Sequence, residues 1–121
     1  RKHIMGFLTT HVLDTAQGVP GSNMSVSLYR IVNGQRELLN QQMTNSDGRC
    51  DGPLLKDDAF VVGIYELEFG VSDYFTQAKV SQPSPAFLTE VTLRFGIAAQ
   101  DDHYHVPLLV SPYSYSTYRG S

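Results

Sequence analysis

The chain has 121 residues, of which 17% are charged and 41% hydrophobic, and its formal net charge at pH 7 is −3. These values fit one folded domain with its own core and exclude a disordered chain. The negative charge gives no general attraction to phosphate backbones or anionic lipids, and no apolar run reaches the ~18 residues of a membrane span, so we expect no nucleic-acid and no membrane partner.

The chain begins with RKHIM, which is short and basic and leads into no signal-like apolar core. We expect residues 1–6 to be an N-terminal extension, either native or added, and residues 7–121 to form a single domain. His3 lies in the extension and receives no role. The expected compartment is the cytoplasm, or the periplasm if an export signal has been removed.

The first strand is predicted in LTTHVLD, residues 8–14. His11 shares a face with Thr9 there, whereas Val12 points to the other side. Further strands follow the same period of two in MSVSLYRI, in VVGIYELEF and in FLTEVTLRF, where the apolar residues Phe87, Val91, Leu93 and Phe95 fall on odd positions. Turn signals such as VNGQ, NSDGRCDG and SQPSP separate these runs, which indicates an antiparallel sandwich or barrel.

The turn NSDGRCDG carries two residues of chemical interest. Arg49 follows Asp47 and Gly48, which provide the bend. Cys50 is the single cysteine of the chain, so it cannot form an internal disulfide, and this favours a reducing compartment. Because spacing alone defines no catalytic partners for it, we interpret Cys50 as structural.

One segment departs from the strand pattern. SDYFTQAKV offers Ser72 or Asp73 as a helix N-cap, and residues 75–79 could form two turns of helix before the proline-rich stretch that follows. We therefore expect an all-β sandwich that carries one short helix.

The last long strand is predicted in HYHVPLLV, residues 103–110. Tyr104 and Val106 begin its core face, so His103 and His105 point outward, into solvent or a partner subunit. Two imidazoles at this spacing can bind zinc if His11 supplies a third ligand, but this is a weak metal signal. An ordinary solvated histidine is the alternative for each position.

The segments LTTHVLD, NSDGR and HYHVPLLVSPYSYSTYRGS, in this order, resemble the transthyretin-like 5-hydroxyisourate hydrolases of purine breakdown. The similarity covers the chain from about Phe7 to Ser121. The final YRGS is the discriminating piece, because the hormone-carrying transthyretins share SPYSYST but lack this tetrapeptide.

The resemblance implies a set of site residues. The implied catalytic residues are His11, Arg49, His105 and Ser121. The implied substrate-binding residues are Tyr118, Arg119 and Gly120, with anchoring of the last strand as the alternative role of Arg119. His103 has no catalytic counterpart, and the resemblance implies no metal and no cofactor.

The resemblance also implies a fold, an assembly and a reaction. The fold is a sandwich of two four-stranded antiparallel sheets with one short helix, and the assembly is a homotetramer of paired dimers whose active sites open into the channel between dimers. The reaction is hydrolysis of 5-hydroxyisourate to 2-oxo-4-hydroxy-4-carboxy-5-ureidoimidazoline in urate degradation. His11 and His105 would activate water, since histidine is partly neutral near neutral pH.

Two rival classes stay open. A binding module of the transthyretin type would use the same channel without chemistry, and it predicts an apolar or lysine-lined channel. A metal-dependent hydrolase would use His11, His103 and His105, and it predicts loss of activity in chelator.

Overall fold

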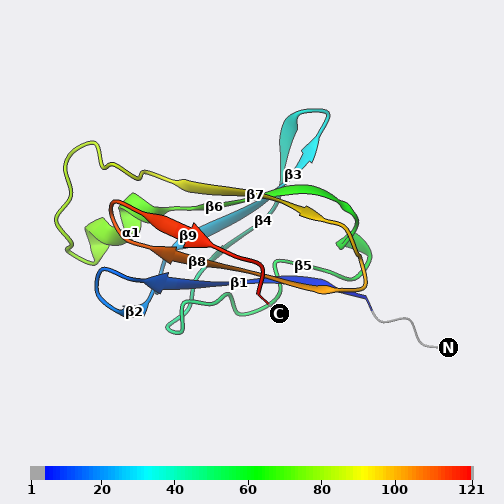
Figure 1. Cartoon of the computed structure of the whole chain (residues 1–121), viewed down its shortest axis with the longest axis horizontal. Helices are drawn as coiled ribbons and strands as arrows, with labels where there is room; N and C mark the ends of the chain where they lie inside the picture. Colours follow the sequence, from blue (N-terminus) through cyan, green and yellow to red (C-terminus); the bar gives the residue numbers. More distant parts are fainter. Residues whose placement is uncertain (1–4, 121) are drawn as a thin grey trace.

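The computed structural model, which describes residues 5–120, is a sandwich of two β-sheets with a short α-helix at one end (Figure 1). In the first sheet the order is β2-β1-β8-β9, with β5 also paired to β1; in the second it is β4-β3-β6-β7. The strands of the first sheet are β1 (Phe7–Asp14), β2 (Val19–Pro20), β5 (Leu55–Lys56), β8 (His103–Val110) and β9 (Tyr115–Thr117). Those of the second are β3 (Ser25–Val32), β4 (Gln35–Met43), β6 (Gly63–Phe69) and β7 (Val91–Ile97), and a 3-10 turn, η1 (Asp57–Ala59), precedes β6.

The predicted all-β sandwich is confirmed, with two differences in the first sheet. It has five strands within the described residues instead of four, because the two-residue β5 pairs with the start of β1. The pair β1 and β8 is parallel, whereas an antiparallel sheet was expected. A period of two shows that a strand exists, but it carries no information on which strand lies beside it or in which direction.

The core between the sheets consists of the inward positions that the alternation predicts. Val12, Val26, Leu28 and Leu108 each have 0% exposure. Full burial of such a side chain stabilises the fold by about 1.5–3 kcal/mol. The sandwich therefore rests on the apolar face of each sheet, which leaves the outer faces free for polar side chains.

The strand predicted from Phe87 begins only at Val91. Phe69, the last residue of β6, is the partner of Val91, and the chain turns into the helix directly after it. Residues before Val91 therefore have no neighbouring strand, and Phe87 is 68% exposed, near the ring of Tyr113.

The helix α1 (Val71–Gln77) begins four residues before the predicted helix of residues 75–79. Its N-cap residue is Gly70, so no side chain caps it, whereas Ser72 or Asp73 was expected. Its buried residues Val71, Tyr74 and Phe75 follow the spacing of one helix face. The Tyr74 hydroxyl donates to the buried carboxylate of Asp14 at 2.7 Å, and burial together with this carboxylate raises the Tyr74 pKa. This contact fixes the helix to the end of β1.

Candidate active site

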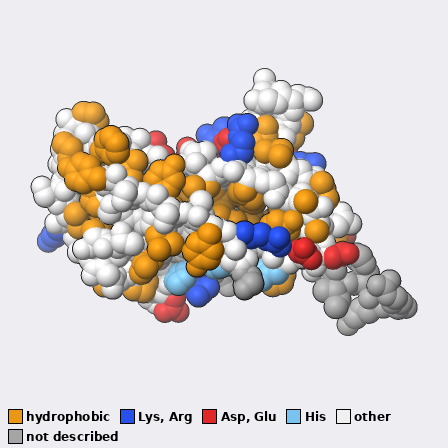
Figure 2. Space-filling view, in the orientation of Figure 1, with side chains coloured by type: hydrophobic (Ala, Val, Ile, Leu, Met, Phe, Trp, Pro, Cys, Tyr) orange, Lys and Arg blue, Asp and Glu red, His pale blue; other side chains and the backbone are white. Residues whose placement is uncertain are grey.

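β1 and β8 lie side by side, with Thr9 opposite His105 and His11 opposite Pro107. Alternate residues of both strands point out of the sandwich, so Thr9, His11 and His105 share the outer face of this sheet with His103. These four side chains are half-buried, which confirms the predicted outward face of the histidines. Figure 2 shows histidine surface along the lower side of the molecule.

The turn that follows β4 places Arg49 next to His11, with which it forms an isolated antiparallel bridge. The side-chain oxygen of Asn45 accepts the N–H of Arg49 at 3.1 Å, and the N–H of Val12 donates to the Gly48 carbonyl at 2.8 Å. Gly48 has a φ of 76°, and a Cβ there would collide with the Val12 carbonyl, so the turn requires glycine. Arg49 is exposed, and no carboxylate of the described residues 5–120 pairs with it.

The His11 ring is held by this same turn. Its Nε2 lies 3.1 Å from the carbonyl oxygen of Asp47. Because a carbonyl oxygen only accepts, Nε2 carries the proton, and Nδ1 has the lone pair when the ring is neutral. The contact fixes both the orientation and the tautomer of His11.

The pKa of His105 is lowered by its surroundings. Burial lowers its pKa, and the charges of Arg49, His103 and His11 lower it further because they penalise the protonated ring. His105 is therefore neutral over more of the range near pH 7 than a free histidine. A neutral imidazole is the form that can take a proton from water.

A cavity of about 330 Å³ lies over these groups. Its lining residues are Thr9, Thr10, Arg49, Cys50, Gly52, His103 and His105. Burial raises the pKa of the Cys50 thiol, as does the neighbouring Asp51 carboxylate, so the thiol stays protonated. This agrees with a structural role for Cys50 and leaves Arg49, His103 and His105 as the chemical groups of the cavity, while His11 lies beside its lining.

The segment after β9 returns to the site. Gly120 forms a bridge with His105 in the register of the β8 and β9 pair, and its N–H donates to the His105 carbonyl at 2.7 Å. A Cβ at Gly120 would lie 2.8 Å from Cδ2 of the His105 ring. Tyr118, two positions earlier, is 61% exposed and lines a different cavity, together with Tyr104 and Arg119. Ser121, an expected catalytic residue, lies outside the described residues, as does His3.

Arg119 makes its contacts on the side of the last segment away from the histidines. Its guanidinium lies over the Tyr104 ring at 3.9 Å, donates to the His103 carbonyl at 3.3 Å, and is 3.7 Å from the Asp102 carboxylate. Tyr104 belongs to the core face of β8, so Arg119 turns away from the histidines. These contacts favour the alternative in which Arg119 anchors the last strand.

The zinc hypothesis joined His11, His103 and His105. The part of the chain that the structure describes has no group of three or more His, Cys, Asp or Glu side chains arranged to hold a metal ion. Nε2 of His103 and Nδ1 of His105 both point instead at the Thr9 hydroxyl, at 2.9 and 2.8 Å. Sequence reasoning missed Thr9, although the period of two had placed it on the face of His11.

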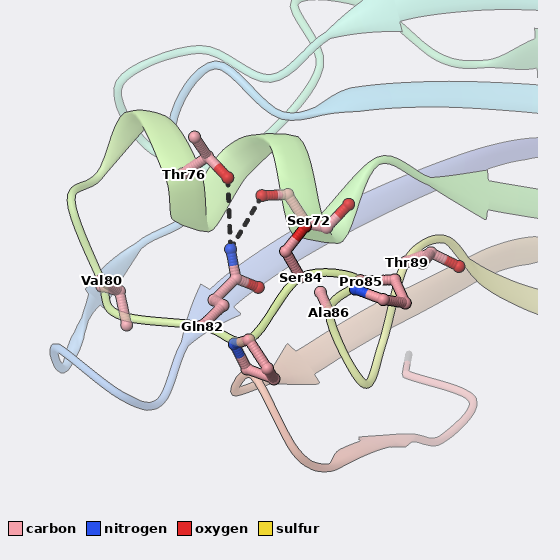
Figure 3. A pocket seen from close by; sticks show the side chains of 9 residues that line it. Ser72, Thr76, Val80, Gln82, Ser84, Pro85, Ala86 and Thr89 are labelled. Carbon is pink, nitrogen blue, oxygen red and sulfur yellow. Dashed lines mark hydrogen bonds between the residues drawn. The ribbon is translucent and has the colours of Figure 1, made fainter.

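A larger cavity, of about 470 Å³, lies at the other end of the sandwich, between α1 and the loop before β7 (Figure 3). The side chain of Gln82 crosses it and donates to the Ser72 carbonyl at 3.2 Å and to the Thr76 hydroxyl at 3.3 Å. Its lining contains serine, threonine, proline and aliphatic residues and no ionisable side chain. It therefore offers no group for acid or base chemistry.

The fold and the site define a transthyretin-like β-sandwich with a polar histidine and arginine cluster on one outer sheet face. The chain belongs to the HIUase/Transthyretin family, whose model matches residues 8–120. It is 61% identical over 117 residues to the 5-hydroxyisourate hydrolase of Ralstonia nicotianae, which covers 97% of this chain and 100% of that protein.

Solved structures agree with this assignment. The structure of Klebsiella pneumoniae 5-hydroxyisourate hydrolase is 33% identical, has a TM-score of 0.80, and matches 97% of this chain and 100% of that one. A crystal structure of (S)-allantoin synthase is 48% identical with a TM-score of 0.93, and it matches 98% of this chain. The chain spans 45% of the length of that synthase. Among the described residues, no helix is long and apolar enough to cross a membrane.

Proposed function

We propose that this chain hydrolyses 5-hydroxyisourate to 2-oxo-4-hydroxy-4-carboxy-5-ureidoimidazoline, with His11, Arg49 and His105 as its catalytic residues. The observation that carries the proposal is the convergence of these three residues, from two strands and a turn, on one outer sheet face. The names of the family and of the relatives supply the substrate. The expected hydrolase class agrees with those names.

Neutral His105 takes a proton from water as the water oxygen bonds to a ring carbonyl carbon. The carbon–nitrogen bond of the six-membered ring then breaks, and the proton returns to the departing nitrogen. Arg49 binds the carbonyl oxygen and stabilises the negative charge that develops on it. His11 orients the water or passes the proton, since its ring is held by the Asp47 carbonyl.

The proposed assembly is a homotetramer of paired dimers in which the outer face of β1 and β8 lines a channel. The residues of this face support it. The histidines there are half-buried in the single chain, and a partner subunit across the face would shield them further from solvent and close the site. Tyr118 and Ser121 are proposed to contact the substrate there, with Gly120 shaping the wall. The compartment proposed is the cytoplasm, or the periplasm after removal of an export signal.

The test is the ultraviolet decay of 5-hydroxyisourate freshly generated from urate by a urate oxidase. The chelator-treated protein is expected to accelerate this decay. His105→Ala is expected to lower kcat by about 10²–10⁴-fold, and Arg49→Ala by about 10²–10³-fold. Arg36→Ala is the matched control, since it removes an arginine from the outer face of the other sheet, and it is expected to keep wild-type turnover.

No acceleration by a folded wild-type sample would overturn the proposed function. Activity that disappears with chelator and returns with zinc would favour the metal-dependent class. Near-normal rates in both site variants would refute the residue assignment even if the substrate is right.

A further inference from the structure

The Thr9 hydroxyl joins the two imidazoles of β8. Its Oγ1 lies 2.9 Å from Nε2 of His103 and 2.8 Å from Nδ1 of His105. A hydroxyl has one proton to donate and two lone pairs that accept. Thr9 can therefore donate to only one of these nitrogens, so at least one of the two carries a proton when both hydrogen bonds are formed.

Both rings are fixed by their neighbours. His103 stacks on the ring of Phe7, with 4.1 Å between centroids and 20° between planes. The Cδ2 edge of His105 lies against Gly120. Because Nδ1 of His105 faces Thr9, Nε2 is the nitrogen of this ring that is left for a ligand in the cavity.

We propose that Thr9 is a positioning residue for the hydrolysis: its hydroxyl accepts the Nδ1–H of His105 and donates to Nε2 of His103. This arrangement leaves the lone pair of His105 on Nε2, where it can take the proton of water. In the reverse arrangement the hydroxyl donates to Nδ1 of His105, and its Nε2 already carries a proton and cannot act as the base. The inference rests on the proposed function and deepens it.

Of these two arrangements, the proposed one carries the reaction without rearrangement at Thr9. When Nε2 of His105 takes a proton, the ring becomes an imidazolium with a proton on each nitrogen. The Nδ1–H still donates to Thr9, and the hydroxyl still donates to His103. In the reverse arrangement the same charged state would require the hydroxyl proton to turn away from Nδ1 of His105.

A hydroxyl suits this position better than a carboxylate. An aspartate beside His105 would orient the ring equally well, but its negative charge would raise the pKa of the histidine. Thr9 orients the ring and adds no charge. Among the described residues, the charges of Arg49, His103 and His11 lower the pKa of His105, in addition to the larger effect of burial.

The first test reads the tautomers directly. Imidazole nitrogen shifts are measured by ¹⁵N NMR on the full-length chain, uniformly labelled, at a pH above the titration of His105. In wild type, His105 is expected to carry its proton on Nδ1, and His103 is expected to have an unprotonated Nε2. In Thr9→Val, His105 is expected to populate both tautomers. A wild-type His105 protonated on Nε2 overturns the proposal.

The second test uses kinetics. Thr9→Val is expected to lower kcat by about 10–100-fold with KM nearly unchanged. Thr9→Ser restores the hydroxyl and is expected to recover most of this loss. His103→Phe keeps a ring against Phe7 without the nitrogen and is expected to have a smaller effect than Thr9→Val. Thr15→Val is the matched control, because it removes a hydroxyl that donates to the Val110 carbonyl just beyond the end of β1.

These outcomes separate the inference from the function on which it rests. Wild-type turnover in Thr9→Val, or a loss that Thr9→Ser does not recover, overturns the positioning role while the hydrolase stands. The tautomer measurement needs no substrate. If wild type fails to hydrolyse 5-hydroxyisourate, the proposed function fails, and the NMR result still decides whether Thr9 sets the His105 tautomer.

Discussion

Replacing Gly120 by alanine tests whether the segment after β9 must lie against the catalytic ring. The added Cβ would lie 2.8 Å from Cδ2 and 3.3 Å from Cβ of His105. Carbon atoms pack at about 3.5–4.0 Å, so either the ring or the segment has to move by roughly 1 Å.

The magnitudes indicate which of the two moves. Forcing a methyl into a packed site costs about 1–3 kcal/mol. Detaching residue 120 breaks the hydrogen bond from the Gly120 N–H to the His105 carbonyl, which contributes about 0.5–1.5 kcal/mol, and leaves Arg119 in place over the Tyr104 ring. Because releasing the segment costs no more than compressing the ring, we expect residue 120 to detach and His105 to stay in place.

The expected result is a loss of turnover with little loss of stability. A misplacement of about 1 Å in a site can lower the rate by roughly 10²-fold, so we expect 10–100-fold slower decay of 5-hydroxyisourate with about 1 kcal/mol or less of destabilisation in urea. Ser116→Ala, a change at an exposed residue of β9, is the control. Wild-type turnover in Gly120→Ala would refute the reasoning, and a destabilisation well above 3 kcal/mol would show that the ring moves instead.

Two further predictions concern charge and packing. The positive charge of Arg49 lowers the pKa of His105, so Arg49→Gln is expected to raise the pKa of His105. The acid limb of the remaining kcat/KM–pH profile should then move to higher pH. A limb that stays in place or moves to lower pH contradicts this. Asp14→Ala removes the acceptor of the Tyr74 hydroxyl and of two backbone N–H groups, so it is expected to cost about 2–4 kcal/mol in urea unfolding. Tyr74→Phe is expected to cost about 1–3 kcal/mol, and a larger loss than that of Asp14→Ala would refute this account of the helix anchor.

The strand faces could be read from the sequence because they depend only on local alternation. Val12 and Leu108 are core residues, and His11 and His105 point outward, as the period of two predicts. The same rule fails at Phe87, where the alternation continues but the partner strand has already ended. A pattern along one strand says nothing about the length of its neighbour.

The resemblance supplied the site residues, and the structure brought His11, Arg49 and His105 to one face. It turned Arg119 toward Tyr104 instead, since neighbouring residues of an extended segment point to opposite sides. Ser121 stays a proposed site residue because it lies outside the described residues.

By itself the sequence determined the sandwich, the outward histidines and the family motifs, because these depend on alternation and on residue types along a short segment. Only the tertiary structure decided that β1 runs parallel to β8 and that Thr9 lies opposite His105. That pairing joins residues 96 positions apart, and no local pattern specifies the neighbour of a strand. The Thr9 hydroxyl between two imidazoles is therefore a consequence of register, which is set by the packing of the whole sandwich.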